Sequence, residues 1–133
     1  MPFRVQGNTR ATGLGLQAHV LLFIFGNMSE SEPRNVLPLQ GEIDLNVSPQ
    51  IATTFTELAQ AKAPHVVVDL TNVTYIDSSG LAVLIVGMQQ VKEYGGKFAL
   101  VGLQHDVRSI FETAQLDQFF STYPHVDDAL SAD

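Results

Sequence analysis

The chain contains no cysteine, so it forms no disulfide and offers neither a thiol nucleophile nor a thiolate metal site. Basic residues are also scarce: seven lysines and arginines stand against fourteen aspartates and glutamates, which gives a net charge of -7. An acidic surface repels phosphate backbones and anionic lipids, so we expect no direct nucleic-acid partner. The absence of cysteine is compatible with the cytoplasm, which is the location we expect.

The sequence also lacks an apolar run long enough to span a bilayer. Residues 18–25 form an apolar stretch that is too short for a membrane helix, and residues 26–29 fit the cleavage site of a signal peptide poorly. We therefore expect neither membrane insertion nor secretion. The stretch is rich in β-forming residues and could be an edge strand, or Met28 could be the natural start. Residues 1–33 are thus an uncertain N-terminal extension, and residues 34–133 form the predicted domain.

Clusters of residues that hold metals and nucleotides are missing as well. The histidines stand singly, without the paired spacing of metal ligands, at His19, His65, His105 and His125. No glycine-rich loop with a following lysine is present, so nucleotide binding is unsupported. We expect no metal and no cofactor, and we interpret the histidines as surface or loop residues.

What the sequence does contain is a strong strand-and-helix signal at its centre. With 133 residues, 45% of them hydrophobic, the chain is long enough for one domain. The run Val66–Leu70 is typical of a strand buried on both faces, and a polar turn at Thr71 and Asn72 is expected before a second apolar stretch ends at Ile76. A helix follows, ended by the glycines at 95 and 96. Its apolar residues recur at three- and four-residue spacing: Leu81, Leu84, Ile85, Met88 and Val91.

Further strands and helices alternate around this pair. Residues 36–39 predict a strand that Pro38 confines to a sheet edge or a strand start, and residues 40–44 are expected to leave the sheet. Ser48 and Pro49 predict the cap and the first residue of a helix. Similar patterns predict a strand at 97–103, a short helix at 107–114, a short strand at 119–123 and a last helical turn at 126–132. We predict an α/β fold with a small mixed, mostly parallel sheet of about four to five strands and amphipathic helices packed against it.

The turn between the central strand and the central helix carries candidate chemistry. It consists of Asp77, Ser78, Ser79 and Gly80. Aspartate and serine are preferred helix caps, so either Asp77 or Ser78 should cap the helix and leave a hydroxyl at its positive end. A phosphate there is favoured by about 0.3–1 kcal/mol, and a serine there can accept one without melting the helix. A capped turn without chemistry would look the same from these residues alone.

Several motifs, in this order and spacing, resemble the STAS domain of bacterial anti-sigma-factor antagonists. They are Gly41-Glu42-Ile43-Asp44, Val66-Val67-Val68-Asp69-Leu70, Tyr75-Ile76-Asp77-Ser78-Ser79-Gly80-Leu81, Gly95-Gly96-Lys97 and Leu100-Val101-Gly102. The resemblance covers residues 36–130 and implies the STAS fold. Its specificity lies in the order and spacing of the motifs, since no single motif would be specific.

The resemblance implies a phosphorylation-controlled protein switch that is not an enzyme. Ser78 would be the phosphoacceptor for a partner that is both anti-sigma factor and ATP-dependent serine kinase. The unphosphorylated form would bind this partner and free a sigma factor, and a serine phosphatase would reset the cycle. Asp77, Ser79 and Gly80 would shape the turn, and Asp44 would lie at the partner-facing edge. A phosphate adds about two negative charges, which oppose docking on an interface matched to a neutral hydroxyl.

Other functions fit parts of the same pattern. A serine hydrolase would need Gly-x-Ser-x-Gly, but Ile76 or Asp77 stands at the first glycine and no histidine lies in a matching context. A STAS module can also act as a non-phosphorylated scaffold or binding subunit, for example in a lipid-transport complex or a signalling assembly, and the fold does not separate these roles. The complete Asp-Ser-Ser-Gly turn favours the switch.

Two features depart from the family pattern. Gln115 stands where a glycine commonly precedes Leu116 and Asp117, so the end of that helix is expected to close differently. The first strand of the family has no clean counterpart before Val36, so the edge of the sheet would need other cover.

Overall fold

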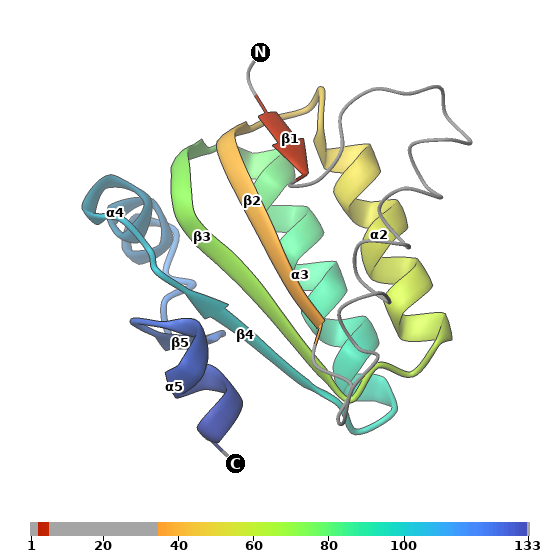
Figure 1. Cartoon of the computed structure of the whole chain (residues 1–133). Coiled ribbons are helices and arrows are strands. Elements are labelled where there is room, and N and C mark those ends of the chain that lie inside the picture. The colour runs from red at the N-terminus through yellow and green to blue at the C-terminus, as the bar shows by residue number, and fades with distance from the viewer. Residues whose placement is uncertain (1–2, 6–34, 133) are drawn as a thin grey trace.

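The computed structural model describes residues 3–5 and 35–132, which form a single mixed sheet with helices on both faces (Figure 1). The strands lie in the order β1-β2-β3-β4-β5; β1 is antiparallel to β2, and the other pairs are parallel. The predicted mixed, mostly parallel α/β fold is confirmed. The elements are β1 (Phe3–Val5), β2 (Asn35–Ile43), α2 (Ser48–Gln60), β3 (His65–Ile76), α3 (Ser78–Glu93), β4 (Lys97–Val101), α4 (His105–Thr113), β5 (Ser121–Tyr123) and α5 (Val126–Ser131).

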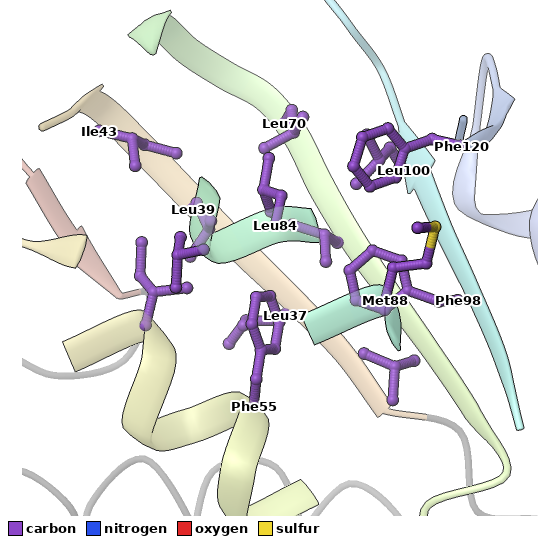
Figure 2. Close-up of a cluster of buried hydrophobic side chains, with 14 of the residues drawn as sticks. Leu37, Leu39, Ile43, Phe55, Leu70, Leu84, Met88, Phe98, Leu100 and Phe120 are labelled. Atoms are coloured by element: carbon purple, nitrogen blue, oxygen red, sulfur yellow. The ribbon is translucent and has the colours of Figure 1, made fainter. Parts of the chain in front are cut away.

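The central valines of β3 divide between two hydrophobic clusters, one on each face of the sheet. Val66 and Val68 belong to the main core, which α2 and α3 cover, whereas Val67 belongs to a smaller cluster with Ala129 of α5. Side chains of β2, β3 and β4 meet those of α2 and α3 in the main core (Figure 2). Burial on both faces explains the continuous apolar run of this strand.

β2 is longer than the sequence predicted. Residues 40–43 were expected outside the sheet, but β2 continues to Ile43, which pairs with Ile76. The reason is Gly41, whose positive φ of 81° lies beside a register shift in the pairing with β3. The glycine therefore forms a bulge inside the strand rather than a turn after it. Pro38 lies inside β2 rather than at its start, and β1 pairs with residues 39–41, immediately beyond it.

The predicted turn at Thr71 and Asn72 is also wrong, because β3 runs unbroken from His65 to Ile76. The carboxylate of Asp69 accepts hydrogen bonds from the Thr71 backbone N–H at 3.0 Å and from the Thr71 hydroxyl at 2.6 Å. A register shift against β2 falls at the same place. Thr71 and Asn72 thus lie at a second irregularity in the pairing of β2 with β3, and β3 continues through it.

α2 begins one residue earlier than a serine cap would require. Val47 is the N-cap and makes no side-chain cap, whereas the predicted cap Ser48 is the first helical residue and is buried. Its hydroxyl donates 2.8 Å to the carbonyl oxygen of Asp44. Pro49 is therefore the second helical residue, in the first turn, rather than the first as predicted.

The N-terminal extension contributes β1, which supplies the strand that had no counterpart before Val36. The apolar stretch 18–25 and Met28 lie outside the described residues. The domain boundary at residue 34 stays a prediction.

Candidate functional site

Parallel pairing of β2 and β3 brings two acidic loops together at their carboxyl ends. Ile43 and Ile76 are in register, and the Asp77 backbone N–H donates 3.1 Å to the carbonyl oxygen of Ile43. Asp44 and Asp77 therefore begin adjacent loops, each leading into a helix. All the residues predicted for the site lie on these loops or in the first turn of α3. This is the edge at which open α/β sheets usually place their sites.

Asp77 caps α3, which decides between the two predicted caps. One carboxylate oxygen accepts from the Ser79 hydroxyl at 2.6 Å and from the Gly80 backbone N–H at 3.1 Å. The pKa of Asp77 is lowered below its ordinary value, chiefly by the hydrogen bond from the Ser79 hydroxyl. Partial burial raises this pKa, and hydrogen bonds from the backbone N–H groups of Gly80, Ser79 and Leu45 lower it further. A carboxylate thus already occupies the positive end of the helix.

A chain of hydroxyl contacts connects the two loops. The Ser48 hydroxyl lies 3.0 Å from the Ser79 hydroxyl and 2.8 Å from the Asp44 carbonyl oxygen, while Ser79 lies 2.6 Å from Asp77. Two hydroxyls have only two protons for these three contacts. The Asp44 carbonyl oxygen already accepts from the backbone N–H groups of Val47 and Ser48. Ser79 donates to Asp77, and the single proton of the Ser48 hydroxyl serves either the Asp44 carbonyl oxygen or the Ser79 hydroxyl.

Ser78 differs from Ser79 in both exposure and bonding. It is exposed as the first residue of α3, and its hydroxyl makes no hydrogen bond to any residue that the structure describes. Ser79 is partly buried and held between Asp77 and Ser48. A reagent approaching this turn therefore meets the hydroxyl of Ser78, while that of Ser79 is already engaged.

Gly80 is a packing residue at this turn. A Cβ atom added to it would lie 2.7 Å from a methyl carbon of Ile76 and 2.8 Å from a methyl carbon of Ile43. The carbonyl oxygen of Ile43 would be 2.9 Å away. The missing side chain lets the start of α3 approach β2 and β3 closely, which sets the position of Ser78.

The Asp44 loop adds an exposed apolar side chain beside these polar groups. Asp44 stabilises its own loop by accepting from the Asn46 backbone N–H at 3.0 Å. Leu45 follows it and is 71% exposed, the largest fraction among the exposed large hydrophobic residues of the described chain. Sequence patterns did not single out Leu45, and they singled out Ser48 only as a helix cap. Only the adjacency of the β2 and β3 ends indicates them.

An apolar groove lies next to the turn, between α3 and α4. It has a volume of about 360 Å³ and is lined by Leu81, Ser109, Ile110, Thr113 and Ala114. Leu81 joins the groove to the site, because its backbone N–H donates 3.0 Å to the carbonyl oxygen of the cap Asp77. Leu81, which the sequence placed on the apolar face of its helix, is only partly buried, and so is Ile110.

The described residues include no group of three or more histidine, aspartate or glutamate side chains that could hold a metal ion. Within the same ranges, no helix has the length and apolar character needed to cross a membrane.

Comparison with known proteins agrees with this architecture. The anti-sigma F factor antagonist of Paenibacillus polymyxa is 26% identical over 97 residues, covering 72% of this chain and 83% of the relative. A solved anti-sigma factor antagonist from Mycobacterium paratuberculosis has a TM-score of 0.69 and 27% identity, covering 77% of this chain and 87% of that one. Unphosphorylated SpoIIAA, at 18% identity and a TM-score of 0.65, covers 96% of this chain and 92% of its own and shows the same fold. Because the family model of the STAS domain matches residues 27–129, the chain belongs to the STAS domain family.

Proposed function

We propose that this protein is an anti-sigma-factor antagonist that is switched by phosphorylation of Ser78. The observation that carries the proposal is the contrast between the exposed, unbonded hydroxyl of Ser78 and the engaged hydroxyl of Ser79. In unphosphorylated form the protein binds an anti-sigma factor that is also a serine kinase, and a sigma factor is freed. A serine phosphatase restores the unphosphorylated form. The names of the relatives from Paenibacillus polymyxa and Mycobacterium paratuberculosis support this reading.

The electrostatics of the turn favour a switch that works by repulsion. A phosphate on Ser78 would add about two negative charges next to the Asp77 carboxylate, whose pKa is already lowered by its hydrogen bonds. The Gly80 N–H that would attract a phosphate is already bonded to Asp77. The phosphate therefore gains little inside the protein and remains at the surface, where it opposes the docking of a partner matched to a neutral hydroxyl.

The apolar surface on both sides of the turn supports protein docking. The groove at Leu81 and Ile110 lies between α3 and α4, and Leu45 is exposed on the loop that follows β2. Apolar side chains around a small polar centre are typical of the core of a protein interface. We assign these residues, together with Asp44, to the contact with the anti-sigma factor.

The same geometry favours regulation over catalysis. No histidine in the described ranges hydrogen bonds to Ser78 or Ser79, so neither serine has the base that an activated nucleophile needs. The protein thus acts as a substrate and ligand of other proteins, and we place this cycle in the cytoplasm, where sigma factors and ATP are present.

Binding to the anti-sigma kinase of the same organism tests the proposal. Titration calorimetry should show that Ser78→Asp weakens binding at least about tenfold, a loss of about 1.4 kcal/mol, because a carboxylate stands where the partner meets a hydroxyl. Ser78→Ala should bind like the wild type. Ser121→Asp places the same charge at an exposed serine on β5 and should also leave binding unchanged. Unaltered affinity of Ser78→Asp would contradict the switch and favour a non-phosphorylated scaffold subunit.

A further inference from the structure

A separate cavity lies at the opposite ends of the parallel strands, on the face that α5 covers. Its volume is about 180 Å³. His65 and Lys97 are in register at the starts of β3 and β4, and Ser121 of β5 is in register with Ala99. Alternate residues of a strand share one face of the sheet. Lys97 and Ala99 therefore point to the same side as Val101, which packs in the smaller hydrophobic cluster with Ala129 of α5. Ala129 of α5 lines the cavity from the other side.

The lining of this cavity is rich in hydrogen-bond donors. Lys92 at the end of α3 and Lys97 contribute ammonium groups, and Ser121 and Tyr123 contribute hydroxyls. None of the described lining residues is acidic, although acidic residues outnumber basic ones fourteen to seven in the chain. Neither lysine forms an ion pair with another described residue. Two cations without an ion-pair partner among the described residues thus line one cavity in a protein whose net charge is -7.

We propose that this cavity binds a small oxyanion of the phosphate type. Lys92 and Lys97 would supply the charge, and the hydroxyls of Ser121 and Tyr123 would supply directed donors. The volume of about 180 Å³ lies below the range of roughly 300–1,000 Å³ that drug-sized ligands occupy. The cavity is nevertheless several times larger than the roughly 30 Å³ that one water molecule occupies in the liquid. The ligand is therefore inorganic phosphate or a small phosphate ester rather than a nucleotide, and the inference does not rest on the function of Ser78.

The helix ends near this cavity oppose an anion only weakly. Lys92 lies in the last turn of α3, where a helix carries about half a negative charge. One ammonium group offsets that partial charge, and Lys97, at the start of β4, adds a full positive charge. The two lysines are thus the charged side chains that line the cavity, which distinguishes its lining from the acidic loops at the Ser78 end of the sheet.

Amide chemical shifts of the full chain, titrated with sodium phosphate against sodium chloride of equal ionic strength, test the proposal. Phosphate should produce saturable shifts at Lys97, Ser121 and Tyr123, with none at Ser78. Acetate should bind more weakly, because a carboxylate offers fewer acceptor oxygens. A small phosphate ester, glycerol phosphate, distinguishes the two ligand sources: tighter binding than inorganic phosphate assigns the site to an ester, and weaker binding assigns it to the free ion.

Charge-removing variants complete the test. Lys97→Gln and Lys92→Gln should each weaken phosphate binding at least fivefold, whereas Lys62→Gln, which removes an exposed lysine outside this cavity, should not. All three variants should keep the wild-type spectrum elsewhere. Shifts that chloride reproduces, or that persist unchanged in both cavity variants, would overturn the proposal. If the variants unfold, the melting temperature of the wild-type chain gives an independent test. A melting temperature that phosphate does not raise would overturn the proposal.

Discussion

Adjacent serines at the start of α3 have opposite surroundings, and this difference defines the candidate site. Sequence motifs predicted Ser78 as the phosphoacceptor and Ser79 as a residue that shapes the turn. In the structure Ser79 is held by Asp77 at 2.6 Å while Ser78 is exposed, and the two roles stay predictions. Sequence alone could not choose between Asp77 and Ser78 as the cap, because both residue types accept the same N–H groups.

The charge on Asp77 should make folding stability depend on pH. Asp77→Asn keeps an oxygen for the cap but loses the charge at the helix N-terminus, so we expect the free energy of unfolding at pH 7 to fall by about 0.3–1 kcal/mol. Because the pKa of Asp77 is lowered in the folded protein, the unfolded chain binds the proton first as the pH falls.

The wild type should therefore lose stability between about pH 5 and pH 2, and the asparagine variant should lose less of it. Urea denaturation of both proteins across this range measures the difference, which isolates Asp77 from the other carboxyl groups. Parallel curves for the two proteins would show that the Asp77 carboxylate contributes no pH-dependent stability.

Gly80 should tolerate no side chain. Gly80→Ala would place a Cβ atom 2.9 Å from the Ile43 carbonyl oxygen and closer still to two methyl groups, so we expect a loss of about 1–3 kcal/mol in denaturant unfolding. Ser78→Ala is the matched control on the same helix turn. Since Asp77 and not Ser78 is the cap, the free energy of unfolding of Ser78→Ala should stay within about 0.5 kcal/mol of the wild-type value. If Gly80→Ala and Ser78→Ala had equal free energies of unfolding, the close approach of Gly80 to Ile43 and Ile76 would be refuted.

Strands and helices were largely predictable, because apolar spacing reports which face of an element is buried. The predicted α3, β4, α4 and α5 all occur close to their expected positions. The errors fell on Gly41 and on Thr71–Asn72, where residues typical of turns form irregularities inside β2 and β3. Neighbouring strands hold such residues in the sheet, and that long-range pairing cannot be read from a local pattern.

Three helices end with the same backbone motif, although only α3 has a glycine in the left-handed position. Lys62, Gly95 and Gln115 follow the ends of α2, α3 and α4, and each has a positive φ, of 56°, 86° and 61°. At α4, the Leu116 N–H donates 2.8 Å to the Phe111 carbonyl oxygen, as in a Schellman motif. The expectation that α4 would close differently because of Gln115 is therefore wrong: the motif is kept, at a cost in strain.

Replacing Gln115 with glycine should relieve that strain. A left-handed conformation costs a non-glycine residue roughly 1–2 kcal/mol, whereas glycine loses roughly 0.5–1 kcal/mol through its unfolded-state entropy. Gln115→Gly should therefore raise the free energy of unfolding by up to about 1 kcal/mol. Gly95→Ala, the reverse change at α3, should lower it by a similar amount. Thermal or urea unfolding measures both, and a destabilised Gln115→Gly would contradict the assignment of strain.

At the scale of the whole molecule, the sheet separates two candidate sites. The acidic loops that follow β2 and β3 carry Ser78, and the lysine-lined cavity lies at the other ends of the strands. The first end was predictable, because parallel strands place their carboxyl ends side by side. The apolar groove at Leu81 and Ile110 was not, since it depends on how α4 packs beside α3. The cavity escaped prediction for the same reason: its residues come from strands and helices far apart in the chain.

The central claim concerns one hydroxyl, and its phosphate occupancy in the native host tests it most directly. Intact mass and peptide mapping should be applied to the wild type, Ser78→Ala and Ser79→Ala, each recovered from growing and from stressed cells. We predict a single phosphate on Ser78 whose occupancy changes with condition and persists in Ser79→Ala, while Ser78→Ala carries none. A fully phosphorylated Ser78→Ala variant, or a wild type without phosphate even after incubation with ATP and the anti-sigma kinases of the host, would contradict the account.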